Sequence, residues 1–178
     1  LTCIGAGGGG HSGTISHLAL IPKVRAMFDG TIIMAGAVGH GAAIRSAQAL
    51  GADLAYMGTR FIAATESSAV PAYKQMLVDS AYKDIISTSA ITGALANKLR
   101  PSLVAAGLDP DNLPPRGKFD LSNRENDIKA WKDLWSAGHG VGQVKAIEDA
   151  GRIIATIKQQ YRDAIAAERA DPWARKYA

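Results

Sequence analysis

Two apolar runs that each end in glycine, with a helix-like stretch between them, restrict the fold of this chain more than any other feature. Residues 32–41 read Ile-Ile-Met-Ala-Gly-Ala-Val-Gly-His-Gly, and residues 54–61 read Leu-Ala-Tyr-Met-Gly-Thr-Arg-Phe. Apolar residues recur at helical spacing over residues 42–50, and Gly51 stands where a helix C-cap would lie. We therefore predict a strand–helix–strand unit whose strands, apolar on both faces, lie in a parallel sheet covered by helices.

The turns that follow these two strands are expected to lie side by side. Parallel strands joined by one helix are usually neighbours, about 4.8 Å apart, with their C-terminal ends at the same edge. Gly36-Ala37 and Gly58-Thr59 would then present backbone N–H groups at one place, to which the following helices add their positive ends. This predicts a phosphate site like that of the last two strands of a (β/α)₈ barrel. The alternative is that both turns need glycine only for their backbone conformation.

Composition excludes several classes of function. A chain of 178 residues with 47% hydrophobic residues can form one sizeable core, and no apolar run approaches the ~20 residues of a transmembrane helix. The net charge of +4 arises from Lys and Arg spread among acidic residues, so we predict neither nucleic acid nor membrane as a partner. Cys3 is the single cysteine, and no signal peptide is recognisable, which together favour a cytoplasmic protein.

The length of the chain conflicts with a complete barrel. Eight βα units need about 250 residues, whereas this chain begins at Leu1 directly in strand-like sequence and offers at most three strands within residues 1–60. We therefore expect an α/β chain that forms the C-terminal part of a (β/α)₈ TIM barrel. A partial barrel leaves strand edges and apolar surface exposed. Upstream residues or a partner chain, for instance in a homo-oligomer, would complete the sheet.

Three further regions are expected after residues 1–65, which hold the βα units. Prolines interrupt residues 66–146, so we predict a helical and loop insertion there that covers the site or an interface. Residues 147–170 fit a long closing helix with one apolar face, and residues 171–178 a frayed tail. The local predictions are a helix capped by Ser16 and ended by Asp29-Gly30, helices over 66–82 and 128–135, and a helix over 94–107 that is interrupted before Pro101. They also include a strand or turn over 86–93, an irregular segment over 109–127, and a glycine loop over 137–143.

A glycine-rich loop follows the first apolar residues and ends in a histidine. Residues 5–10 fit the G-x-G-x-x-G fingerprint of dinucleotide-binding folds, but five glycines in six residues fit almost any glycine pattern. A P-loop needs lysine where this chain has His11, so the phosphate charge would lack its partner. We interpret His11 as a side chain at the C-terminal mouth of a strand, able to accept or donate a proton near neutral pH. A capping or surface histidine is the alternative.

Most other polar residues are expected to have structural roles. No two histidines have a metal-ligand spacing with a carboxylate between them, so we predict no metal site. We expect the polar residues around position 70 to form local ion pairs or to anchor the core. We expect the cysteine to be buried within its strand. These structural assignments cover Cys3, His17, His40 (as a surface or helix-capping residue), Glu66, Tyr73, Lys74 and His139.

Several short motifs, taken together, resemble the nitronate monooxygenase family, formerly called 2-nitropropane dioxygenases. The resemblance covers residues 1–75 well and the rest of the chain more loosely. It rests on Gly9-Gly-His-Ser-Gly13, Ala35-Gly-Ala-Val38, Ala49-Leu-Gly-Ala-Asp53, Met57-Gly-Thr-Arg-Phe61 and the later Glu66 with Tyr73-Lys74. Family members are FMN-dependent (β/α)₈ barrels with an extra helical segment near the C-terminus, so Leu1 would start the sixth strand.

The resemblance implies a role for each predicted site residue. The backbone at Gly36-Ala37 and Gly58-Thr59 would hold the FMN phosphate, Gly9 and Gly10 would pass close to the flavin, and His11 would be the active-site histidine. In the family an anionic nitronate gives an electron to flavin, O2 reacts, and a carbonyl compound and nitrite leave. A substrate that arrives as the anion needs no proton removed, so His11 would position or protonate it.

Two rival functions remain open from the sequence. The first is another FMN barrel with the same half-motifs, an enoyl-acyl-carrier-protein reductase or an NAD(P)H:quinone reductase. The second is a non-catalytic phosphate-binding module.

Overall fold

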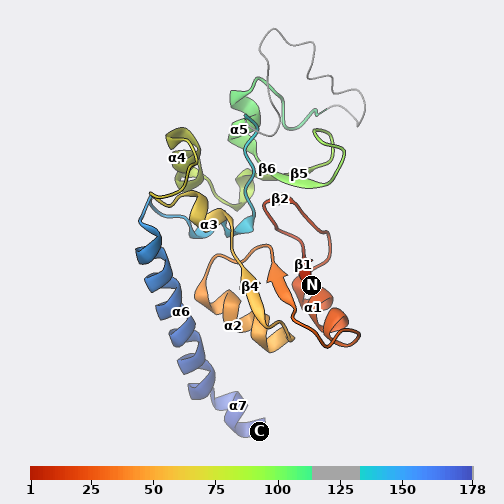
Figure 1. The fold of residues 1–178 in the computed structure, drawn as a ribbon, viewed down its shortest axis with the longest axis vertical. Coiled ribbons are helices and arrows are strands. Elements are labelled where there is room, and N and C mark those ends of the chain that lie inside the picture. Colours follow the sequence, from red (N-terminus) through yellow and green to blue (C-terminus); the bar gives the residue numbers. More distant parts are fainter. Residues whose placement is uncertain (114–132, 178) are drawn as a thin grey trace.

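The computed structural model describes residues 1–113 and 133–177, and Figure 1 shows its fold. Its first sheet consists of three parallel strands in the order β1-β3-β4. Met34 of the central strand pairs in register with Cys3 on one side and Ala55 on the other, so the predicted strand–helix–strand unit is confirmed. The elements of this part are β1 (Thr2–Ile4), α1 (His17–Arg25), β3 (Ile33–Ala35), α2 (Gly41–Leu50) and β4 (Leu54–Tyr56).

The caps predicted for the two connecting helices are both present. At the start of α1, the Ser16 hydroxyl accepts a hydrogen bond from the Leu18 N–H. At the end of α2, Gly51 has φ 104°, the left-handed conformation that glycine adopts without strain.

Helix α1 ends four residues before the predicted Asp29. It stops at Arg25, whose guanidinium donates to the carbonyls of Phe28 and Gly30 and forms a 2.6 Å ion pair with Asp53. These contacts stabilise a turn back towards β3. The residues beyond Arg25 are therefore not part of the helix, although their apolar residues continue its spacing.

The first sheet has one covered face and one exposed face. Successive strand residues point to opposite sides, and the side chains on the covered face pack on α1 and α2 around the predicted buried cysteine. On the other face, Ile4, Leu54 and Tyr56 are exposed. Three strands do not close a barrel. The exposed apolar side chains on this open face are the kind of surface that we expect a partial barrel to leave uncovered. The covered core consists of Cys3, Ile21, Ile32, Met34, Val38, Ala47 and Ala52.

The long C-terminal helix predicted for residues 147–170 is present as α6 (Ala150–Ala170), which lies along α2 (Figure 1). A Cβ at Gly41 would lie 2.2 Å from the Tyr161 nitrogen, so the two helices approach backbone to backbone. The Gly41 N–H donates to Gln160 Oε1 at 3.1 Å. After this helix, in the region predicted as a frayed tail, α7 (Pro172–Tyr177) continues the chain, and the Trp173 N–H donates to Asp171 Oδ1.

A second, antiparallel sheet was not predicted. Its order is β2-β6-β5, and β2 (Gly10–His11) comes from the glycine loop near the N-terminus. The other two strands are β5 (Ile85–Thr88), inside the predicted strand or turn over 86–93, and β6 (Ala96–Leu99). The sheet therefore joins the predicted regions 1–65 and 66–146 through hydrogen bonds.

The predicted helix over 94–107 is wrong in its first half. Residues 96–99 form β6, and only α5 (Arg100–Ala105) is helical. The sequence Ala-Asn-Lys-Leu has no apolar alternation, yet all four residues are buried by neighbouring elements. Tertiary contacts thus override the local pattern.

The remaining elements surround these sheets. The helix predicted over 66–82 is shorter, as α4 (Pro71–Asp79), with η1 (Tyr82–Asp84) after it. The predicted irregular segment 109–127 lies outside the described residues apart from 109–113, and so does most of the predicted helix 128–135, of which residues 133–135 are not helical. A short helix α3 (Thr59–Ile62) follows β4, and η2 (His139–Gln143) lies within the predicted glycine loop.

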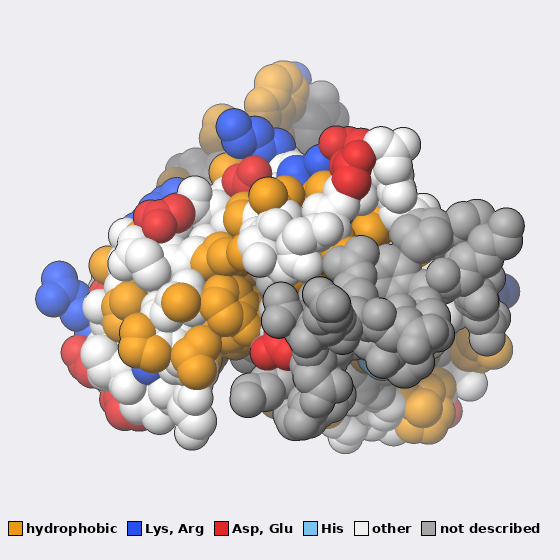
Figure 2. Space-filling model, turned by 90° about the horizontal axis from the view of Figure 1, so that it is seen from above, with side chains coloured by type: hydrophobic (Ala, Val, Ile, Leu, Met, Phe, Trp, Pro, Cys, Tyr) orange, Lys and Arg blue, Asp and Glu red, His pale blue; other side chains and the backbone are white. Residues whose placement is uncertain are grey.

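Charges on the surface are mixed in sign. On the face shown in Figure 2, Lys and Arg side chains lie next to Asp and Glu, with hydrophobic side chains between them. Over the described part of the chain, no helix combines the length and apolarity required to cross a bilayer.

Candidate functional site

The glycine loop between β1 and α1 packs against a second glycine-containing segment. The Gly7 carbonyl accepts hydrogen bonds from the Ala37 N–H at 3.1 Å and from the His139 N–H at 2.9 Å. A Cβ at Gly138 would lie 2.4 Å from the Gly7 oxygen, so glycine is required at this crossing. The N-terminal loop, the β3 corner and the segment before η2 therefore meet at one place.

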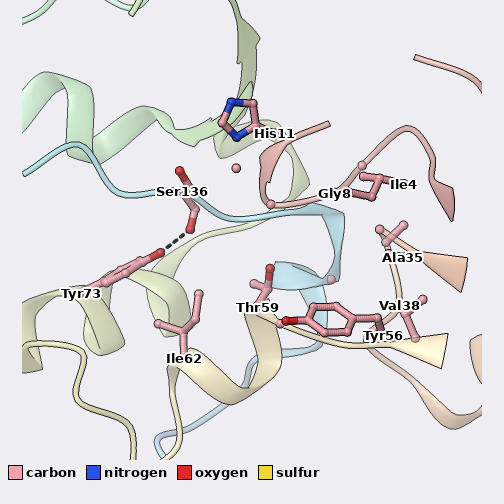
Figure 3. Close-up of a pocket in the computed structure, with 17 residues that line it drawn as sticks. Ile4, Gly8, His11, Ala35, Val38, Tyr56, Thr59, Ile62, Tyr73 and Ser136 are labelled. Atoms are coloured by element: carbon pink, nitrogen blue, oxygen red, sulfur yellow. Dashed lines mark hydrogen bonds between the residues drawn. The ribbon is translucent and has the colours of Figure 1, made fainter. Parts of the chain in front are cut away.

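A cavity of about 220 Å³ opens where these segments meet. Its walls come from the C-terminal ends of β1, β3 and β4, from the glycine loop, and from α4 and the segment before η2 (Figure 3). All seven residues that the sequence singled out lie on its wall: Gly9, Gly10, His11, Gly36, Ala37, Gly58 and Thr59. The predicted residues are thus brought together, although they come from three separate parts of the chain.

The corner after β3 has a strained backbone. Gly36 has φ 103°, and a Cβ there would lie 2.9 Å from the Gly8 nitrogen. Ala37 has φ 58° and is the one non-glycine residue with positive φ among the described residues. Its N–H already donates to the Gly7 carbonyl within the chain, so the phosphate contact expected of the Gly36-Ala37 corner stays a prediction. Strain of this kind is concentrated at functional sites in proteins.

The corner after β4 is open on its cavity side. A Cβ built on Gly58, whose φ is −109°, meets no atom within 4 Å. The residues that follow begin α3, and no side chain caps this helix end. Thr59 is buried, and its hydroxyl accepts a hydrogen bond from the Gly138 N–H at 3.0 Å, which connects this corner to the segment before η2.

His11 projects from a strand edge at the cavity. It is the second residue of β2 and pairs with Ala96 of β6. Figure 3 shows its ring at one side of the cavity, opposite the β4 corner. The imidazole is exposed and has no hydrogen-bond partner within residues 1–113 and 133–177. It is therefore free to contact a ligand, whereas a capping histidine would not be.

The other three histidines differ from His11. His40 Nδ1 accepts from the Ala42 N–H at 3.0 Å and so caps α2, and His17 Nε2 lies 2.8 Å from the Ala35 oxygen. The His139 ring packs against Gly7. None of these three lines the cavity, and no cluster of three or more metal-ligating side chains occurs in the part of the chain that the structure describes.

Core anchoring, expected around position 70, describes the buried Lys74, whereas Glu66 is exposed. The Lys74 ammonium donates to the carbonyls of Ala64 at 2.7 Å and Thr65 at 3.1 Å. The Glu66 carboxylate accepts from the Ala150 N–H at the start of α6, and this hydrogen bond lowers the pKa of Glu66. Both side chains thus connect the segment after α3 to its surroundings, but Glu66 does not share a helix with Lys74.

Tyr73 and Ser136 line the cavity, and the sequence did not single them out as site residues. The Tyr73 hydroxyl donates to the Ser136 carbonyl, and its ring stacks on Trp135 at a centroid distance of 4.9 Å. In Figure 3 the Ser136 hydroxyl points away from Tyr73 towards the side of the cavity that carries His11. The one sequence feature that could have drawn attention to Ser136 is its position, next to a tryptophan and just before a glycine loop. However, nothing in the sequence indicated that this loop lies beside the strand ends.

Burial raises the pKa of Tyr73 to about 12, which gives an expected dependence of stability on pH. The unfolded chain ionises this phenol near pH 10, whereas the folded chain keeps its proton until about pH 12. The free energy of unfolding should therefore fall across this window, by up to roughly 2–3 kcal/mol from this group. Urea titrations at several pH values should show a smaller fall for Tyr73→Phe. Tyr82→Phe, which removes an exposed phenol, is the control and should keep the full fall; equal curves for both variants would contradict the burial effect.

Comparison with known proteins decides the family. The profile of the nitronate monooxygenase family matches residues 1–114, which include every predicted site residue. The chain belongs to the nitronate monooxygenase family. A nitronate monooxygenase of Paraburkholderia phytofirmans is 32% identical over 141 residues, which are 75% of this chain and 38% of that relative. The chain thus spans well under half the length of this relative.

Solved structures agree with the family assignment at the level of the fold. Nitroalkane oxidase from Streptomyces ansochromogenes matches with a TM-score of 0.72 and 25% identity, over 93% of this chain and 52% of that one. FabK from Thermotoga maritima matches with a TM-score of 0.73 and 24% identity, over 95% of this chain and 56% of that one. This nitronate monooxygenase family chain therefore has an α/β fold that corresponds to about half of each of these structures.

Proposed function

We propose that this chain carries the phosphate corners and the active-site histidine of an FMN-dependent oxidoreductase that oxidises alkyl nitronates with O2 to a carbonyl compound and nitrite. One observation supports this more than any other. The corners at Gly36 and Gly58 and the ring of His11 all lie on one cavity, in a chain whose family depends on FMN. The proposal includes further βα units, from upstream residues or a partner chain, which complete the barrel around the open sheet face.

The chemistry of the cavity wall fits a flavin nucleotide. A phosphate group needs several close backbone donors, and glycine corners permit this approach because no Cβ intervenes. The open side of Gly58 and the uncapped start of α3 at Thr59 supply such a surface. At the β3 corner, Gly36 would offer the backbone contact, because the Ala37 N–H is already donated to the Gly7 carbonyl. Gly9 and Gly10 present backbone without side chains at the cavity, as close passage of a flat ring system requires.

The residues of this chain would bind and orient the substrate while the cofactor supplies the redox chemistry. FMN, when bound, accepts the electrons that the nitronate gives up. His11 would donate a hydrogen bond to an oxygen of the nitronate and hold the anion in place, because its ring has no competing partner among the described residues. Since the substrate arrives as the anion, no general base is required. The Ser136 hydroxyl lies on the same cavity as a second polar group.

A spectrum and two substrates test the proposal. The natural protein, expressed from its complete coding sequence, should bind FMN, absorb at about 450 nm and consume O2 with propyl nitronate. A colourless protein would contradict the flavin site and favour a phosphate-binding module. Oxidation of NADH with no response to propyl nitronate would contradict the nitronate reaction and favour a reductase of the same barrel type.

A further inference from the structure

A buried carboxamide connects the second sheet to the loop that carries His11. Asn97, in the centre of β6, is 1% exposed. Its Nδ2 donates to the Gly8 carbonyl at 2.7 Å and to the Ser12 hydroxyl at 3.2 Å. Its Oδ1 accepts a hydrogen bond from the Ser87 hydroxyl of β5, which leaves both Nδ2 protons for the loop.

The two acceptors of this amide lie on either side of the histidine. Gly8 precedes and Ser12 follows the segment Gly9-Gly10-His11, so one NH2 group holds both ends of a five-residue stretch. The backbone of Asn97 also pairs with Gly10. Gly10 has φ 72°, and consecutive glycines restrict the backbone least of all residues. Without such contacts the segment would sample many conformations.

We propose that Asn97 is a positioning residue, whose carboxamide fixes residues 8–12 and thereby the place of His11 at the cavity. This inference rests on the proposed role of His11 in catalysis. It assigns a function to the antiparallel sheet: β5 orients the carboxamide through Ser87, and β6 holds the loop. Displacement of a catalytic group by about 1 Å can lower a rate by roughly 100-fold. Loss of this contact should therefore lower the reaction rate, although Asn97 does not line the cavity.

The test compares Asn97→Leu, which keeps the shape but removes both donors, with Asn112→Leu, the same substitution at an exposed asparagine whose Nδ2 donates to Asp109 and which does not line the cavity. In the natural holoprotein, hydrogen exchange of the peptide over residues 5–13 should accelerate at least about tenfold in Asn97→Leu. With propyl nitronate, kcat should fall roughly 10- to 100-fold while KM changes less than about threefold. Asn112→Leu should leave both readouts within about twofold of the parent. Asn97→Ser, with a smaller side chain, serves the same purpose if the leucine variant does not fold.

A double variant separates positioning from general destabilisation. If Asn97 acts through His11, adding Asn97→Leu to His11→Ala should lower kcat no further than about twofold. Additive losses, or unchanged hydrogen exchange over residues 5–13, would overturn the proposal. It would also be overturned if kcat in Asn97→Leu were unchanged while His11→Ala had lost activity. A fully active His11→Ala would refute the catalytic role of His11 itself, and the exchange data would then still report whether the contact holds the loop.

Discussion

Replacement of His11 by alanine is expected to lower kcat with propyl nitronate by about 100- to 10,000-fold while FMN remains bound. The imidazole lies on the cavity without a protein partner among the described residues, so it is available to the substrate. The corners proposed to hold the phosphate are backbone features at Gly36 and Gly58, which this substitution does not alter. Steady-state O2 consumption and the ratio of flavin to protein absorbance measure the two effects separately.

His40→Ala is the matched control for this experiment. His40 caps α2 through the Ala42 N–H and does not line the cavity. We expect this variant to lose stability, by about 0.5–2 kcal/mol as for other N-caps, and to retain its kcat per bound flavin. Equal losses of turnover and flavin content in His11→Ala would contradict the separate roles assigned to the histidine and the corners.

The second large effect is expected at Gly58. Its φ of −109° is accessible to any residue, and a Cβ there would meet no atom within 4 Å. Gly58→Trp should therefore fold, but its indole would occupy the space assigned to the FMN phosphate. We expect the FMN content of the purified protein to fall by at least about tenfold, since a buried ligand cannot share its site with a large side chain. Absorbance at about 450 nm relative to protein, together with a denaturation curve, gives both readouts.

Gly58→Ala tests whether the loss of FMN depends on the size of the new side chain or follows from any substitution at this position. A single methyl group fits the open side of the corner, so this variant should keep most of its flavin. Gly36→Ala would not serve, because φ 103° and a 2.9 Å approach to the Gly8 nitrogen predict a loss of stability instead. A tryptophan variant that remained fully yellow would show that the phosphate binds elsewhere.

Much of the first sheet could be predicted because its signals are local. Two apolar runs, helical spacing between them and a glycine at position 51 determine a strand–helix–strand unit, and parallel pairing then brings both strand ends to one edge. The candidate site follows from the same logic, because Gly36 and Gly58 end neighbouring strands. Local spacing also predicted the long helix α6, whose apolar face packs along α2.

The second sheet and the rest of the cavity wall were decided by tertiary contacts. Nothing in Ala96-Asn-Lys-Leu99 predicts a strand, since its burial comes from elements distant in the sequence. A two-residue strand at His11 exists only because β6 lies beside it, and Ser136 reaches the cavity only because Tyr73 and Gly138 hold its segment there. The sequence alone thus determined the elements whose hydrogen bonds and apolar faces repeat at short range. The fold decided the contacts between residues far apart in the chain, because their stability depends on partners that no local pattern names.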